Sequence, residues 1–296
     1  MSTDSTVPDT IVLIHGLWMT PRSWEHWIPY YENRGFRVLA PGYPGFDVEV
    51  EALRADPSPI TTLTVPDTVA HLEGVIAGVD KPPIIIGHSF GGTLTQLLLD
   101  RGHGAAGVVI NSAPTEGVRV TPLSQVRSLF PFLDNPANRH KPVGFTPEQF
   151  HYTFCNTLSE QESAKVYERY HIPAPGSWVW SYGLLANFTP GRQETWVDYA
   201  NDARAPLLFI AGGADHHHAG LGEPVERQAL RQSQCLHRLQ GVPRSLALDV
   251  RRGRLGADRR LRPRVGEQPR DRGDRDDRGG PKLRGLDVRG AEAPMR

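Results

Sequence analysis

Residues 82–99 read PPIIIGHSFGGTLTQLLL, and the change of pattern within this stretch decides the fold. The aliphatic run Ile84–Ile86 is typical of a strand buried on both faces, and the residues after Gly91 have the pattern of a helix. Between the two, Gly87, Ser89 and Gly91 fit the motif G-x-S-x-G. Such a tight strand-to-helix turn needs small neighbours and exposes the serine hydroxyl beside a helix N-terminus. The stretch therefore predicts that Ser89 is a nucleophile.

The turn has two other interpretations. A glycine-rich turn that merely links strand to helix remains the alternative. A dinucleotide-binding loop is disfavoured, because GHSFGG lacks the G-x-G-x-x-G spacing that such loops use to approach a pyrophosphate.

Around this turn, short apolar runs alternate with helical patterns. The apolar runs predict further strands within residues 10–16, 36–45, 106–114 and 205–213. Helical periodicity, ending near Gly or Asp, predicts helices within residues 23–35, 65–80 and 92–102. Strand and helix in alternation predict an α/β protein, with a mostly parallel sheet and helices on both faces.

A serine nucleophile needs hydrogen-bond donors for the oxyanion that it creates. The backbone N–H of Phe90, the residue after the nucleophile, is the first candidate. The N–H of Leu17 is the second, since the loop HGLW follows the first predicted strand. His15 is expected to brace that loop; a catalytic role for it is the less favoured alternative.

Three segments follow one another along the chain: HGLW at 15–18, GHSFGG at 87–92 and LLFIAGGADH at 207–216. In this order and at this spacing they resemble the α/β-hydrolase superfamily, in particular cofactor-free bacterial serine hydrolases of the esterase, lactonase and haloperoxidase-like type. The resemblance covers roughly residues 8–216 and implies a doubly wound sheet. It also implies that Asp215 is the acid that orients a base histidine. Glu116, after the preceding strand, is the alternative acid.

The regular alternation breaks between residues 112 and 199. This segment holds 14 of the 24 aromatic residues. The resemblance implies a helical lid inserted over the nucleophile, within a hydrolase core that spans residues 8–216. The aromatic density favours an apolar or aromatic acyl substrate over a charged one.

The last eighty residues differ from the rest in composition. Residues 217–296 carry 19 basic and 11 acidic residues, a charge of +8, while residues 1–216 carry 14 basic and 22 acidic, a charge of −8. All the aromatic residues precede position 217. Such a segment has too little apolar surface to offset its ordering entropy. We expect a disordered or out-of-frame tail without the last strand and helix of the sheet.

The base histidine is missing from its expected place. The family order is Ser, acid, His, with the histidine in a loop after one more strand. His216–His218 adjoin Asp215 too closely. His237 is the candidate base that the chain offers, since it has a suitable distance, but no strand pattern flanks it. No further ligands accompany the histidines, so no metal site is predicted.

A frameshift near His216 is our hypothesis for the missing histidine. In the neighbouring reading frame, DHHHAG can encode Asp-His-Ile-Met-Pro. QGVPRSLALD can encode Lys-Glu-Phe-Pro-Gly-Arg-Ser-His-Trp, with the histidine codon across Ala247 and Leu248. A natural disordered basic tail is the rival interpretation.

The sequence thus predicts a serine hydrolase acting on an ester or lactone of an apolar small molecule, without metal or cofactor. A non-catalytic small-molecule-binding protein, or an inactive frameshifted hydrolase, is the alternative. A tail that tethers the enzyme to nucleic acid is disfavoured by the Asp residues among the arginines of RDRGDRDDRGG. The polar start MSTDSTVPDT and the lone Cys155 and Cys235 predict a cytoplasmic protein with neither nucleic-acid nor membrane partners.

Overall fold

A computed structural model describes residues 7–118, 123–183, 192–212 and 237–242. Asp215, His216–His218, Cys235, Ala247 and Leu248 lie outside the described residues. Within them, Cys155 is buried. No helix in these ranges is both long and apolar enough to cross a membrane.

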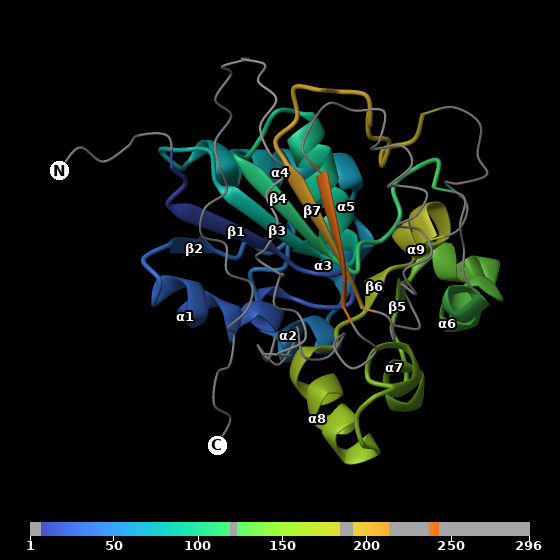
Figure 1. Cartoon of the computed structure of the whole chain (residues 1–296). Coiled ribbons are helices and arrows are strands. Elements are labelled where there is room, and N and C mark those ends of the chain that lie inside the picture. The colour runs from blue at the N-terminus through green and yellow to red at the C-terminus, as the bar shows by residue number, and fades with distance from the viewer. Residues whose placement is uncertain (1–6, 119–122, 184–191, 213–236, 243–296) are drawn as a thin grey trace, which may run out of the picture.

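The centre of the molecule is a six-stranded sheet in the order β2-β1-β3-β4-β7-β8, and every neighbouring pair is parallel (Figure 1). The strands are β1 (Thr10–Ile14), β2 (Arg37–Leu39), β3 (Ile84–His88), β4 (Ala106–Ile110), β7 (Leu207–Gly212) and β8 (His237–Val242). This arrangement confirms the predicted parallel, doubly wound α/β sheet.

The strand order reverses between β1 and β3. From β1 the chain moves outward to β2, returns to β3, and then continues to β4 and β7 on the other side. In open parallel sheets, ligands bind outside the carboxyl ends of the strands at such a reversal. The loops after Ile14 and His88 both leave the sheet at this point.

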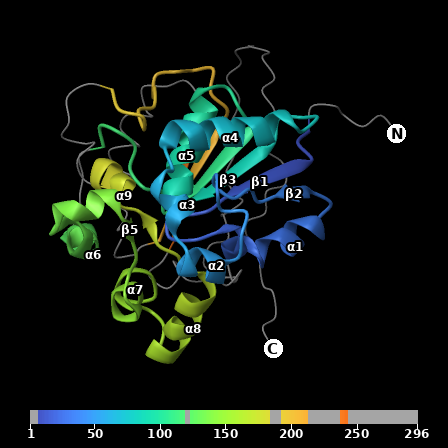
Figure 2. The same cartoon turned by 180° about the vertical axis from the view of Figure 1, so that it is seen from behind.

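Both faces of the sheet are covered. Val12 and Ile14 of β1 pack in one cluster with α4 (Val65–Ala77) and α5 (Phe90–Asp100), which lie across the sheet in Figure 2. Ile11 and Leu13 point to the opposite face and pack with residues of η1 (Pro21–Trp24) and α1 (Trp27–Glu32). Successive side chains of a strand point to opposite faces of the sheet, so a continuous apolar run places apolar side chains on both faces.

Local signals set the helix boundaries. The Thr64 hydroxyl caps α4 by accepting the N–H of Asp67 at 3.2 Å, and Gly78 follows its last residue. Two short helices, α2 (Val50–Ala55) and α3 (Ser58–Thr61), precede α4.

A helical segment lies between β4 and β7, within the predicted interval 112–199; we call it the inserted segment. It contains α6 (Leu123–Leu133), η2 (Pro136–His140), β5 (Pro142–Val143), α7 (Pro147–Phe154), α8 (Glu160–Tyr170), β6 (Ala174–Pro175) and α9 (Gly176–Gly183). β5 and β6 pair as an antiparallel ladder. Capping boxes start α7 at Thr146 and α8 at Ser159. Its helices gather beyond one end of the sheet (Figure 1).

Arg54 on α2 holds the inserted segment at the end of α8. Arg54 donates to the backbone oxygens of His171 at 2.7 Å and of Tyr167 at 2.9 Å, and also to that of Glu168. The last carbonyls of a helix have no hydrogen-bond partner within the helix. The Arg54 guanidinium supplies the donors that these carbonyls of α8 lack. Ion pairs of Arg54 with Glu168 and of Arg169 with Glu25 lie beside it.

The expectation that the tail forms no strand was wrong, because His237–Val242 forms β8, paired in parallel with all six residues of β7. The sequence HRLQGV contains only two aliphatic side chains, Leu239 and Val242, so it lacks the apolar run that marks the other strands. Parallel pairing uses backbone N–H and C=O groups, which every non-proline residue supplies.

Candidate active site

Ser89 lies in a strained turn between β3 and α5. Its φ of 55° and ψ of −123° place a non-glycine residue in a sparsely populated backbone region. The turn is held by its backbone: the Ser89 N–H donates to Ile110 O at 3.0 Å, and Ser89 O accepts the N–H groups of Gly92 and Ala113, both at 2.9 Å. The strained backbone conformation persists because these three hydrogen bonds hold the turn in place.

The flanking glycines are required by close backbone approach. A Cβ at Gly87 would lie 2.1 Å from Gly91 O, and a Cβ at Gly91 would lie 2.3 Å from Ile14 O. β3, α5 and the end of β1 therefore meet at distances that exclude any side chain. These contacts explain the motif G-x-S-x-G by packing.

The loop after β1 lies against Ser89. A Cβ at Gly16 would lie 3.2 Å from Ser89 Cβ and 3.3 Å from His88 Nδ1. The next residue, Leu17, is 5 % exposed. On the other side of Ser89, Phe90 is the first residue of α5, so its N–H has no carbonyl one turn earlier in the helix. The structure thus places Gly16, the residue before Leu17, against Ser89, and Phe90 directly follows Ser89 in the chain.

The peptide between Gly16 and Leu17 is fixed through its carbonyl. Gly16 O accepts the N–H of Met19 at 3.3 Å and lies 2.9 Å from His15 Nδ1. In a trans peptide the C=O and N–H groups point in opposite directions, and the described residues contain no cis bond. Holding this carbonyl therefore sets the direction of the Leu17 N–H.

His15 supports the loop from a fully buried position. Its ring stacks on Tyr43 and Phe46, with centroids 4.0 and 5.7 Å away, and the Tyr43 hydroxyl donates to His15 O at 2.6 Å. Burial lowers the pKa of His15 to about 4, so the ring is neutral at neutral pH. A neutral ring whose Nδ1–H donates to Gly16 O suits the predicted bracing role.

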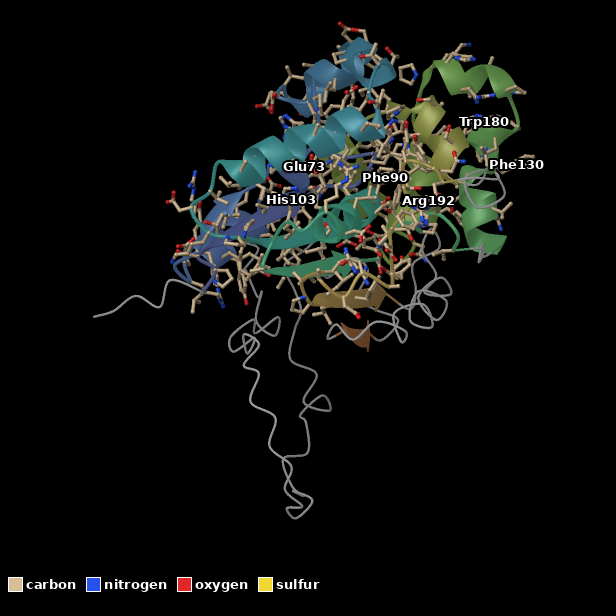
Figure 3. All side chains as sticks on the ribbon, turned by 90° about the horizontal axis from the view of Figure 1, so that it is seen from above. Glu73, Phe90, His103, Phe130, Trp180 and Arg192 are labelled. Carbon is tan, nitrogen blue, oxygen red and sulfur yellow. The ribbon has the colours of Figure 1, made fainter. Side chains whose placement is uncertain are left out.

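Aromatic side chains of the inserted segment cover the residue after the nucleophile. The ring of Phe90 lies 4.8 Å from that of Trp178 and 6.0 Å from that of Tyr182, both on α9. The Trp178 indole N–H donates to Leu63 O at 2.8 Å, which anchors α9 to the core. Figure 3 shows Phe90 near the middle of the molecule and Trp180 and Phe130 toward one end of it. Sequence reasoning identified the aromatic density but not these contacts.

The predicted acid, Asp215, lies three residues beyond the last residue of β7. The register pairs His88 with Ile110 and Ile110 with Ile210, so β7 ends at the same edge of the sheet as Ser89, two strands away. The alternative acid, Glu116, has a structural use: its carboxylate accepts the N–H of Gln193, and its own N–H donates to Thr195 O at 3.1 Å.

His237 is at the wrong end of the sheet to act as the base. It pairs with Leu207, which pairs with Gly107, which pairs with Ile85, four residues before Ser89. Strand geometry therefore separates the backbones of His237 and Ser89 by about 13 Å along the strands and about 14 Å across them. The interpretation of His237 as base is corrected by this register.

A family model described as "Alpha/beta hydrolase family" matches residues 11–268. The chain belongs to the alpha/beta hydrolase family. This membership confirms the predicted superfamily and enzyme class. The match continues past His216, where the change of composition had suggested a boundary.

Solved alpha/beta hydrolase structures show the same fold at low sequence identity. An extracellular alpha/beta-hydrolase from a Paenibacillus species is 19 % identical with a TM-score of 0.58, over 81 % of this chain and 93 % of that one. The thioesterase domain from the curacin biosynthetic pathway is 17 % identical with a TM-score of 0.52, over 84 % and 90 %. A pyrethroid hydrolase from Sphingobium faniae JZ-2 is 17 % identical with a TM-score of 0.52, over 83 % and 96 %. A search of curated proteins found no match.

The described part of this alpha/beta hydrolase contains no group of three or more His, Cys, Asp or Glu side chains arranged to hold a metal ion.

Proposed function

We propose that the protein is a serine hydrolase that cleaves an ester or lactone of an apolar small molecule, with Ser89 as nucleophile. One observation carries the proposal: Ser89 occupies a positive-φ turn at the strand-order reversal, with the Gly16–Leu17 peptide packed against it. A strained serine beside two backbone donors is an arrangement for acyl transfer.

In the proposed reaction, Ser89 Oγ attacks the substrate carbonyl carbon while a base removes its proton. The oxyanion that forms accepts hydrogen bonds from the Leu17 and Phe90 amides, and the N-terminus of α5 adds a favourable dipole. The alcohol then leaves with a proton, and water hydrolyses the acyl-enzyme to return Ser89 to its free form. Asp215 would orient the base.

The base would come from the segment after β8. As written, residues 243–296 contain no histidine. In the neighbouring frame the histidine codon falls across Ala247 and Leu248, five residues after the end of β8 at Val242. In this order of elements a last strand is followed by a loop histidine, and the frameshift hypothesis places the histidine codon in that loop.

The apolar substrate class rests on the side chains around the elbow. Phe90, Trp178 and Tyr182 form a continuous aromatic contact, and we propose that the inserted segment acts as a lid there. Aromatic surfaces bind apolar acyl or alcohol groups better than charged ones. Solved structures with this fold include proteins named pyrethroid hydrolase and polyneuridine aldehyde esterase, in keeping with ester cleavage.

The experiment is active-site labelling with a fluorophosphonate. A bond forms between Ser89 Oγ and phosphorus, fluoride leaves, and the base takes up the hydroxyl proton. In the protein whose reading frame is restored after His216, which would supply the base, we expect labelling, its loss in Ser89→Ala, and unchanged labelling in Ser58→Ala, whose side chain is exposed on α3. Equal labelling of the Ser89→Ala protein would refute the proposal.

The second candidate, a non-catalytic binder on the same fold, is favoured by the absence of a histidine after β8. Labelling and ester turnover should be compared between the chain as written and a protein whose reading frame is restored after His216. Turnover only in the restored protein supports a hydrolase inactivated by frameshift. Turnover in neither supports the binder.

A further inference from the structure

Trp18 connects the oxyanion loop, which we define as residues 15–19, to the inserted segment. It directly follows Leu17, and it is 4 % exposed. Although its backbone belongs to the core, its side-chain partners come from elements more than a hundred residues later in the chain. This connection lies outside the nucleophile, acid and base of the proposed reaction.

Two hydrogen bonds tie Trp18 to the β5–β6 ladder. The indole N–H donates to the backbone oxygen of Val143, the last residue of β5, at 3.2 Å. The backbone oxygen of Trp18 accepts the N–H of Ile172, two residues before β6, at 3.1 Å. The side chain is thus fixed by β5, and the main chain by the segment that leads into β6.

The ring is also held by aromatic contacts. Its centroid lies 4.8 Å from that of Phe145, 5.9 Å from that of Phe132 and 6.0 Å from that of Phe154. These distances are within the range in which aromatic pairs attract beyond simple burial. The three partners come from α6, the β5–α7 connection and α7, so the ring is held by three parts of the inserted segment.

The geometry of the turn links the position of Trp18 to the direction of the Leu17 N–H, the proposed oxyanion donor. The hydrogen bond from Met19 N–H to Gly16 O closes a four-residue turn with Leu17 and Trp18 at its centre. The Leu17 N–H belongs to the first peptide of this turn, and Trp18 anchors the other side. A displacement of Trp18 rotates the peptides of the turn and with them the direction of the Leu17 N–H.

We propose that Trp18 is a positioning residue that aligns the Leu17 oxyanion donor through its attachment to the inserted segment. The role rests on the proposed hydrolase function. Because the donor acts on charge that develops in the transition state, misalignment lowers the rate of reaction at bound substrate and leaves substrate binding nearly unchanged.

The test compares two indole-to-phenyl substitutions in the full-length chain. Trp18→Phe keeps an aromatic ring and removes the N–H that reaches Val143 O. Trp180→Phe is the matched control, because the Trp180 indole N–H donates to Phe132 O at 3.1 Å, a hydrogen bond within the inserted segment. Thermal unfolding identifies any variant that fails to fold. Phe145→Leu, which loosens the contact with the Trp18 ring, replaces Trp18→Phe in that case.

Two measurements decide the outcome. Hydrogen exchange of peptides covering residues 15–19 should be faster in Trp18→Phe and unchanged in Trp180→Phe. The saturating rate of fluorophosphonate labelling should fall about 10- to 100-fold in Trp18→Phe, with an unchanged half-saturation concentration. Unchanged exchange overturns the proposal whether or not Ser89 reacts, and so does faster exchange with an unchanged labelling rate. Where Ser89 is inert in the chain as written, the labelling rate is measured in the protein whose reading frame is restored after His216. A Ser89 that stays inert there overturns both the serine-hydrolase proposal and the catalytic role of Trp18, and leaves only the structural link.

Discussion

Gly16 and Ser89 lie so close that a Cβ on the glycine would be 3.2 Å from the Cβ of the serine. This contact brings the loop after β1 and the turn after β3 together at the reversal of strand order. The space between the two residues therefore limits how far either can move during a reaction at Ser89.

Gly16→Ala should reduce activity more than stability. The added methyl group meets Ser89 Cβ and His88 Nδ1 at 3.2 and 3.3 Å, so the loop must shift by a few tenths of an ångström. We expect a loss of about 10-fold or more in the labelling rate, because oxyanion donors depend on alignment. Gly74→Ala is the control: its Cβ meets nothing within 4 Å on the exposed face of α4. It should stabilise the fold by about 0.5–1 kcal/mol with an unaltered labelling rate.

Gly91→Ala should unfold the protein or destabilise it strongly. Its Cβ would lie 2.3 Å from Ile14 O and 2.6 Å from His15 O, and backbone atoms in a buried sheet cannot move aside. We expect a loss of more than about 3 kcal/mol in the free energy of unfolding. Gly107→Ala should cost less, because its nearest contact is Leu99 Cδ1, the end of a side chain that can change rotamer. Urea denaturation of both variants checks the order; equal losses would show that the turn has room to adjust.

Acid should destabilise the protein through His15. Burial lowers its pKa to about 4 in the folded chain, so the unfolded chain, with an ordinary pKa of 6.5, binds the proton more readily. Stability is therefore complete above about pH 6.5 and falls as the pH falls toward 4. This single group changes the free energy of unfolding by roughly 3 kcal/mol over that window.

The variants for this prediction are His15→Gln and, as control, His140→Gln on an exposed part of η2. Denaturation at pH 7 and pH 5 should show a weaker pH dependence in His15→Gln than in the control. His171 acts in the same direction, since burial and the nearby Arg54 lower its pKa to about 3. An unchanged slope in His15→Gln would contradict the assignment.

Arg54→Lys should loosen the inserted segment from the core. An ammonium group cannot reach the carbonyls of Tyr167, Glu168 and His171 together as the guanidinium does. We expect faster hydrogen exchange in α8 and a loss of about 1–2 kcal/mol. Arg101→Lys, in an exposed ion pair with Glu73, should cost about 0–1 kcal/mol and leave α8 unaffected. Equal exchange in α8 for the two variants would refute the role of Arg54.

Removal of β8 should make the protein aggregate. A chain ending at residue 236 exposes the backbone edge of β7, whereas one ending at residue 242 keeps the edge paired. The shorter protein should form larger species in size-exclusion chromatography at the same concentration. If both proteins behave alike, β8 does not protect that edge.

The local parts of this structure could be predicted from the sequence. The run Ile84–Ile86 and the G-x-S-x-G residues predict their strand and turn because each depends on near neighbours in the chain. β8 could not be predicted, because its sequence HRLQGV has no apolar run. The segment pairs with β7 through backbone groups, which leave no pattern in the sequence. The link between Trp18 and Val143 joins residues 125 positions apart, and no periodicity reports such a contact. The role of Asp215 and the location of the base stay predictions.

The inserted segment also governs the order in which the sheet can be completed. β4 ends at Ile110 and its neighbour β7 begins at Leu207, so the ribosome must synthesise the whole inserted segment between them. At about 5–20 residues per second, this takes roughly 5–20 s. During that interval the nascent chain carries four finished strands, with the apolar edge of β4 unpaired. The yield of folded protein in a cell therefore depends on what shields that edge until β7 leaves the ribosome.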